Sequence, residues 1–129
     1  MRRVKLPRPT EHEEQVALAH VLTRAGLLWC AVPNGARTSM RTAVKLKREG
    51  LHSGVPDVLI FDPPPGTRYV GACVELKRAG APPSAVSVAQ REWLAMLAGR
   101  GWLAIVGYGW QDAAAKLRAA GYIGMGVTR

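Results

Sequence analysis

The stretch "GVPDVLIFDPPPGTRYVGACVELKRAG", Gly54 to Gly80, contains two apolar runs on either side of a proline-rich turn. The runs "DVLIF" (57–61) and "RYVGACVELK" (68–77) are rich in β-branched and aromatic residues, a composition typical of strands. The "DPPPG" segment between them cannot join a hydrogen-bonded ladder and forms a stiff turn. We therefore predict two neighbouring antiparallel strands, with an acid at the start of the first and another near the end of the second.

The second strand has two different faces, because successive side chains of a strand point to opposite sides of the sheet. One face is apolar and is the expected core face: Val70, Ala72, Val74 and Leu76. The other face begins at Cys73 and ends with Glu75 and Lys77. In an antiparallel pair the start of the first strand lies near the end of the second, so we expect Asp57 and Glu75 to converge.

Two convergent carboxylates repel each other unless a cation lies between them. A divalent cation with oxygen ligands suits such a pair, and Mg²⁺ takes one or two carboxylates together with water and substrate phosphate. We expect the backbone carbonyl of Leu76 to add a ligand, and Lys77 to orient a water molecule and neutralise charge on the phosphate. The alternative is structural: Glu75 and Lys77 form a surface ion pair, and Asp57 caps a strand.

The rest of the chain alternates between helical and strand patterns. Helices are predicted over 11–26, 36–50, 82–101 and 110–121, and further strands over 27–32 and 102–108. Thr10 and Ser87 are the expected N-caps, and Val16 and Val88 are expected to point inward. The order α, β, α, β, β, α, β, α predicts an α/β domain with a small mixed central sheet flanked by helices.

The chain is strongly basic: eighteen Lys and Arg residues against nine Asp and Glu give a net charge of +9. In a small protein this balance favours a polyanionic partner, usually nucleic acid. The helix at 36–50 carries four cations on one side, which either track DNA phosphates or form an ordinary solvated face: Arg37, Arg41, Lys45 and Arg48. Asn34 and Gly35 precede this helix, where they either offer backbone N–H groups to a phosphate or form a plain turn.

The length corresponds to one domain, which we expect to span residues 10–122, between a flexible basic arm at 1–9 and a C-terminal tail at 123–129. No apolar run approaches the ~20 residues of a transmembrane helix, and the N-terminus lacks the apolar segment of a signal peptide. Cys30 and Cys73 lie in apolar runs without metal-type spacing, so both are expected to be buried, reduced thiols in a cytoplasmic protein.

Several short motifs follow one another in a specific order: "EHEEQ" (11–15), "PNG" (33–35), "LKREGLHSGVPD" (46–57), "VELKR" (74–78) and "AQREWLAML" (89–97). Together they resemble the virus-type replication-repair nuclease (VRR-NUC) family of the PD-(D/E)XK nuclease superfamily. The resemblance extends from Thr10 to the last helix, and it implies a restriction-endonuclease-like core.

The resemblance implies roles for residues of the second strand and of the third helix. Asp57 and Glu75 would be metal ligands, and Lys77 would be the catalytic lysine. Gln90 would support the site or touch the substrate; the alternative is an ordinary surface glutamine.

A further acid of the site is implied in the first helix. Glu11 matches best, with Gln15 four residues later on the same side of the helix, where Gln15 is expected among the residues that contact DNA. Glu13 and Glu14 compete for the position of Glu11, and all three acids are also explained as a favourable acid cluster in the first turn of a helix.

The implied activity is a Mg²⁺- or Mn²⁺-dependent endonuclease that hydrolyses phosphodiester bonds in DNA without an organic cofactor. Stand-alone members of the family look like homodimers that cut branched DNA such as Holliday junctions, a task that suits two symmetric sites. The implied location is the cytoplasm of a bacterial or phage-infected cell. The alternative is a non-catalytic nucleic-acid-binding module on the same fold, in which the acids are structural.

Overall fold

The structure is a computed structural model that describes residues 6–33 and 39–123. The elements follow the order predicted from the sequence, with one short 3-10 helix (Pro83–Ala85) added. In chain order they are α1 (Glu11–Arg24), β1 (Trp29–Ala31), α2 (Met40–Arg48), β2 (Val58–Ile60), β3 (Gly71–Lys77), α3 (Val88–Ala98), β4 (Trp102–Tyr108) and α4 (Trp110–Ala119).

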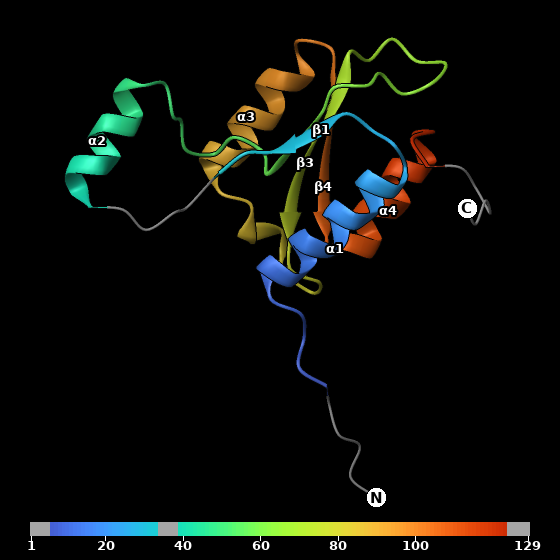
Figure 1. The fold of residues 1–129 in the computed structure, drawn as a ribbon, viewed down its shortest axis with the longest axis horizontal. Coiled ribbons are helices and arrows are strands. Elements are labelled where there is room, and N and C mark those ends of the chain that lie inside the picture. Colours follow the sequence, from blue (N-terminus) through green and yellow to red (C-terminus); the bar gives the residue numbers. More distant parts are fainter. Residues whose placement is uncertain (1–5, 34–38, 124–129) are drawn as a thin grey trace, which may run out of the picture.

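The four strands form one mixed sheet in the order β1-β2-β3-β4. The first three strands pair antiparallel, as predicted for β2 and β3, and β4 pairs parallel to β3. Figure 1 shows α1 and α4 together on one side of the sheet and α3 on the other side. The small mixed sheet flanked by helices is therefore confirmed.

The main core lies between the sheet and the α1/α4 pair. Ala72, Val74 and Leu76 of β3 are buried there against Leu18 of α1 and Leu117 of α4. This confirms the predicted core face of β3 for three of its four residues. Val70 is 52% exposed instead, because β3 begins only at the following residue. The opposite face of β3, which carries Glu75, is turned toward α3.

Two predicted helix starts are confirmed by their capping bonds. The Thr10 hydroxyl accepts a hydrogen bond from Glu13 N, and the Glu13 carboxylate accepts one from Thr10 N. Ser87 and Gln90 form the same reciprocal arrangement at the start of α3. Such capping boxes satisfy N–H groups that the first helical turn leaves without partners.

Three burial predictions are wrong. Val16 is exposed because α1 turns the row Glu14, Leu18 and Leu22 toward the core, at spacings of four residues. Val88 is 60% exposed in the first turn of α3. Cys30 is exposed on the edge strand β1, whereas Cys73 in the central strand β3 is buried as expected.

Helix α2 stands apart from the rest of the molecule (Figure 1). It begins after the N-cap Ser39, so the predicted start at residue 36 lies outside the described residues. No residue of α2 is buried, and Met40 and Val44 are 84% and 52% exposed. Within residues 6–33 and 39–123, no helix is both long and apolar enough to cross a bilayer.

Candidate functional site

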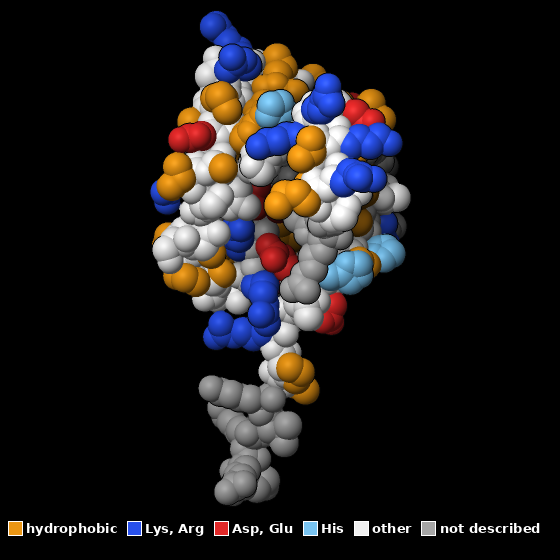
Figure 2. Space-filling model, turned by 90° about the vertical axis from the view of Figure 1, so that its left-hand side faces the viewer, with side chains coloured by type: hydrophobic (Ala, Val, Ile, Leu, Met, Phe, Trp, Pro, Cys, Tyr) orange, Lys and Arg blue, Asp and Glu red, His pale blue; other side chains and the backbone are white. Residues whose placement is uncertain are grey.

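A cavity of about 630 Å³ opens where β3 ends between α1 and α3. It brings together seven residues that the sequence analysis selected: Glu11, Gln15, Asp57, Glu75, Leu76, Lys77 and Gln90. Figure 2 shows the hollow with acidic side chains inside and Lys and Arg side chains around it. The crevice outside the carboxyl end of a strand is a common place for ligands in α/β sheets.

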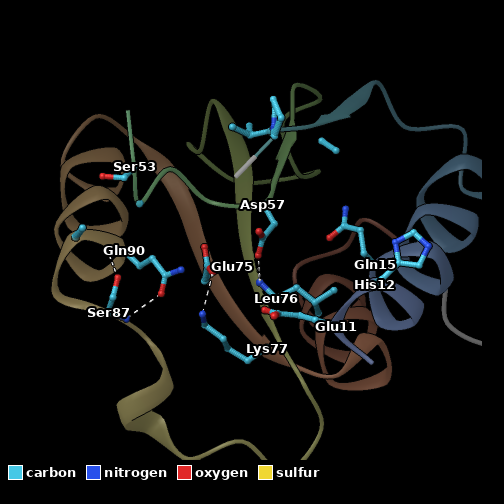
Figure 3. A pocket seen from close by; sticks show the side chains of 15 residues that line it. Glu11, His12, Gln15, Ser53, Asp57, Glu75, Leu76, Lys77, Ser87 and Gln90 are labelled. Atoms are coloured by element: carbon cyan, nitrogen blue, oxygen red, sulfur yellow. Dashed lines mark hydrogen bonds and ion pairs between the residues drawn. The ribbon is translucent and has the colours of Figure 1, made fainter. Parts of the chain in front are cut away.

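Strand pairing places Asp57 opposite Glu75. Val58 pairs with Val74, so continuing the same antiparallel register by one residue places Asp57 directly opposite Glu75. Residues that lie opposite each other in this way point to the same face of the sheet. The backbone also holds Asp57 in place, because its carbonyl accepts a hydrogen bond of 2.8 Å from Val32 N. Its Oδ2 accepts a bond of 2.7 Å from Leu76 N, which ties the carboxylate to β3 (Figure 3).

Glu75 is 1% exposed and only half paired. Its Oε1 lies 3.4 Å from Lys77 Nζ, whereas its Oε2 is buried with no hydrogen-bond partner in the described part of the chain. Burial raises the pKa of Glu75 to about 8, the negative charge of Asp57 adds to this rise, and Lys77 opposes it. The protein alone therefore does not provide enough positive charge and enough donors for an ionised Glu75.

The donor set suits a hard divalent cation. A cation between Asp57 and Glu75 would bind the unpartnered Oε2 of Glu75 and would favour the ionised form of this carboxylate. No group of three or more His, Cys, Asp or Glu side chains that could hold a metal occurs among the described residues. Two carboxylates are nevertheless what Mg²⁺ uses when water and phosphate complete its six ligands. Leu76 lies between Glu75 and Lys77 and also lines the cavity.

The three competing acids of α1 have different surroundings. Glu11 lines the cavity, next to Gln15 on the same side of the helix (Figure 3). Glu13 belongs to the capping box with Thr10. Glu14 is buried and accepts hydrogen bonds from two backbone N–H groups outside the cavity. Of the three, only Glu11 reaches the cavity.

Gln90 reaches the cavity from α3 and also has a structural role. Its Oε1 accepts a hydrogen bond of 2.8 Å from Ser87 N, and this bond fixes the side chain. Figure 3 shows the remaining amide nitrogen turned toward Glu75 and Lys77. Gln90 is thus presented to the cavity as a fixed hydrogen-bond donor.

Sequence reasoning missed the loop between α2 and β2, which forms one wall of the cavity. Gly54 has φ +91°, and a Cβ there would lie 2.7 Å from the Ala89 carbonyl carbon, so this loop is pressed against α3. The rings of His52 and Trp93 also contact each other, with centroids 5.8 Å apart. Ser53 lines the cavity beside Gly54. The glycine in "HSGVPD" was the available signal, because φ in this range favours glycine.

Six further lining residues were also outside the sequence-based set: His12, Ala31, Val32, Pro33, Ser87 and Ala89. His12 follows Glu11 on α1, and none of the histidines was expected as a ligand. Ser87 was predicted only as an N-cap. The available signal for His12, Ser87 and Ala89 was their position close to Glu11 or Gln90 in the chain.

Of the predicted DNA-binding residues that the structure describes, Gln15 lines the cavity, whereas the three cations of α2 do not. Arg41, Lys45 and Arg48 lie together along one exposed side of α2. Asn34, Gly35 and Arg37 lie outside the described residues. The basic side of α2 therefore lies outside the acidic cavity.

Comparison with known proteins gives two findings. The model of the VRR-NUC domain family matches residues 9–110, a range that includes every cavity residue. A solved structure described as a VRR_NUC domain protein is similar, with a TM-score of 0.71 and 26% sequence identity over 87% of this chain and 88% of that chain. No curated protein matches the chain.

Proposed function

The chain belongs to the VRR-NUC domain family, a nuclease-type family, and from this premise we propose that it is a Mg²⁺- or Mn²⁺-dependent DNA endonuclease. The observation that carries the proposal is the buried, unpartnered Oε2 of Glu75 in a cavity shared with Asp57 and Lys77. A buried acid without a partner is costly to stability, and such groups concentrate at functional sites.

The proposed metal ligands are Asp57, Glu75 and the carbonyl of Leu76, with Glu11 on the facing helix. A bound ion would supply Lewis-acid stabilisation of the charge that develops on the phosphate. Lys77 keeps its ammonium group at this end of the cavity through the contact with Glu75. From there it can donate to a phosphate oxygen or orient the attacking water. Gln90 would donate to the substrate from the opposite wall.

DNA would be held by the positive charge around the cavity. The exposed side of α2 carries Arg41, Lys45 and Arg48, and the whole chain carries +9. Contacts of this kind go to phosphates and position a duplex without reading its sequence. We include Arg37 and the Asn34–Gly35 pair in this surface on the basis of the sequence alone.

We further propose that the chain acts as a homodimer on branched DNA. Support comes from an exposed apolar stripe formed by Met40, Ala43 and Val44 of α2 and by Leu51 just after the helix, which we call the apolar stripe of α2. All four residues are exposed, and no element of the same chain packs extensively on this helix. Exposed apolar patches of this kind typically mark protein interfaces. A second copy packed there would leave the basic side of α2 open for DNA.

Cleavage assays on a four-way junction, a flap and a linear duplex, with Mg²⁺, Mn²⁺ or EDTA, test the proposal. Wild type should cut only with metal, and Asp57→Asn should still bind DNA but cut at least about a thousandfold more slowly, the size of effect expected when a key site group is removed. Glu92→Gln, an exposed acid on α3, is the matched control. DNA binding by wild type without any cleavage would favour the non-catalytic module.

A further inference from the structure

Glu14 is a buried acid that the proposed chemistry does not use. Its residue is 1% exposed, although it lies in a helix whose neighbouring acids face solvent. Its Oε2 accepts a hydrogen bond of 3.1 Å from Ala79 N, and its Oε1 accepts one of 3.4 Å from Trp110 N. Burying a carboxylate is unfavourable unless donors of this kind compensate the lost water.

The hydrogen bond from Ala79 N to Glu14 holds the chain just after the end of β3. Ala79 follows Lys77 by two residues, and the Lys77 carbonyl itself accepts a hydrogen bond of 2.7 Å from Gly109 N. The end of β3 is therefore held from two sides, by Glu14 and by the backbone that leads into α4. Lys77 can present its side chain to Glu75 only while this end of the strand stays in place.

The backbone at Gly109 is shaped to accommodate the Glu14 carboxylate. Gly109 has φ +91°, and a Cβ there would lie 2.7 Å from Glu14 Oε2. A side chain at this position would be strained and would push the carboxylate away from its donors. The close approach of Glu14 to Gly109 and Trp110 is thus a specific contact, not incidental burial.

Glu14 also shares a helix with two cavity residues. Glu11 lies one turn before it, and Gln15 follows it directly, on the side of α1 that faces the cavity. A helix moves as a rigid unit, so a bond that fixes Glu14 also fixes the distance from Glu11 to the end of β3. We propose that Glu14 is a positioning residue, which holds α1 with Glu11 at a set distance from Lys77. This inference rests on the proposed nuclease function.

If Glu14 only filled space in the core, other side chains of similar size could replace it. The test therefore compares substitutions that keep the volume but remove the hydrogen bonds. Leucine at position 14 would fill the space but would leave Ala79 N and Trp110 N without an acceptor. Glutamine keeps the shape and one acceptor, but it turns an NH₂ group toward one of the two N–H donors. Glu14→Gln therefore disturbs the two bonds with the least change in packing.

The experiment compares wild type with Glu14→Gln and with the control Glu13→Gln, which keeps its capping box because glutamine serves in that position. Glu14→Asp, which keeps the charge on a shorter side chain, is measured in parallel and replaces Glu14→Gln if that variant does not fold. Hydrogen exchange at Ala79 and Trp110, Mn²⁺ affinity without DNA, and kcat and KM for cleavage are the readouts.

For Glu14→Gln we expect faster exchange at Ala79 and Trp110 with unchanged exchange at Val74. We also expect a loss of about tenfold to a hundredfold in Mn²⁺ affinity or kcat, the usual range for residues that orient site groups, with KM for DNA nearly unchanged. Normal exchange at both amides, or a kcat that falls only in proportion to the folded fraction, would overturn the inference. Exchange and Mn²⁺ affinity need no cleavage, so they decide the matter even if the wild type does not cut DNA.

Discussion

Lys77 Nζ lies 3.4 Å from Oε1 of Glu75, and Oε2 of the same carboxylate has no hydrogen-bond partner among the residues that the structure describes. The Lys77 side chain is itself only 12% exposed, so this contact forms away from bulk water. One oxygen of Glu75 is thus paired with a cation of the protein, and the other is where we propose that a metal ion binds. The role of Lys77 and the binding of a metal ion can be tested separately.

The first prediction concerns Lys77. Lys77→Met removes the ammonium group but keeps the length of the side chain, so we expect metal binding to persist while cleavage falls by about a hundredfold or more, as for loss of a positioned proton donor or charge. Metal-dependent cleavage and Mn²⁺ titration measure the two effects. Lys47→Met on α2 is the control, and equal cleavage by the two variants would contradict the role of Lys77.

The second prediction concerns metal addition and removal. A ligand at about a hundred times its Kd stabilises the folded state by about 2.7 kcal/mol when it does not bind the unfolded chain. We expect Mn²⁺ to raise the free energy of unfolding by this amount, and EDTA to reverse the change, in denaturant titrations. Asp57→Asn should respond much less than wild type. A full Mn²⁺ response in Asp57→Asn would place the ion elsewhere.

The third prediction concerns pH. Since the pKa of Glu75 rises from 4.5 to about 8 on folding, the folded state retains a proton between these values that the unfolded state releases. Stability is therefore highest below pH 4.5 with respect to this group, and it falls as the pH rises toward 8. The loss is on the order of a few kcal/mol, because one pKa unit corresponds to about 1.4 kcal/mol.

Two comparisons isolate this contribution of Glu75. Glu75→Gln carries no titrating carboxylate, so the difference in unfolding free energy between wild type and variant should change across pH 4.5–8. Saturating Mn²⁺ should flatten the wild-type profile, because the ion favours the ionised carboxylate. Glu13 and Asp112 have lowered pKa values and change their charge below this window. A constant difference between pH 4.5 and 8 would show that Glu75 is not perturbed.

The fourth prediction concerns the basic side of α2. Replacing Arg41, Lys45 and Arg48 by Gln should weaken DNA binding for all sequences alike and should reduce the slope of log K against log salt by about three, close to one unit for each lost phosphate contact. Fluorescence anisotropy at several salt concentrations measures this slope. The Mn²⁺ affinity should stay at the wild-type value, and an unchanged slope would remove α2 from the DNA surface.

The fifth prediction concerns the apolar stripe of α2. Met40→Glu with Val44→Glu should convert the proposed dimer to a monomer, because the double substitution places like charges in the proposed apolar contact. Sedimentation measures the mass, and thermal unfolding should show that each subunit still folds, since no other element packs extensively on this stripe. Thr42→Glu on another side of the helix is the control. A wild type that sediments as a monomer would contradict this interface.

The sequence was most informative where local chemistry determines structure. The two-residue alternation of β3 and the prolines before it were enough to predict the antiparallel pair and the meeting of Asp57 with Glu75. The core side of α1 was not predictable in this way, because apolar residues occur on several sides of it and Val16 is as apolar as Leu18. Tertiary packing selects between these sides.

Long-range partners explain what else was missed. The donors to Glu14 lie 65 and 96 residues further along the chain, so nothing near it in the sequence distinguishes it from Glu11 and Glu13. The approach of Gly54 to Ala89 likewise depends on where α3 packs, and the cavity wall that it forms could not be derived from the motif alone. Periodicity reports on a segment's own faces, not on which remote segment will cover them.

The loop between α2 and β2 is anchored on α3, because His52 contacts Trp93 and Gly54 lies close against Ala89. The backbone N–H groups of residues 49–51 are hydrogen-bonded to the last turns of α2, so the anchored part of the loop begins after them. Asp57 follows Gly54 by three residues, on the anchored side of the loop. In the proposed nuclease, a change in the orientation of α2 on DNA would therefore leave the proposed metal ligand Asp57 in place.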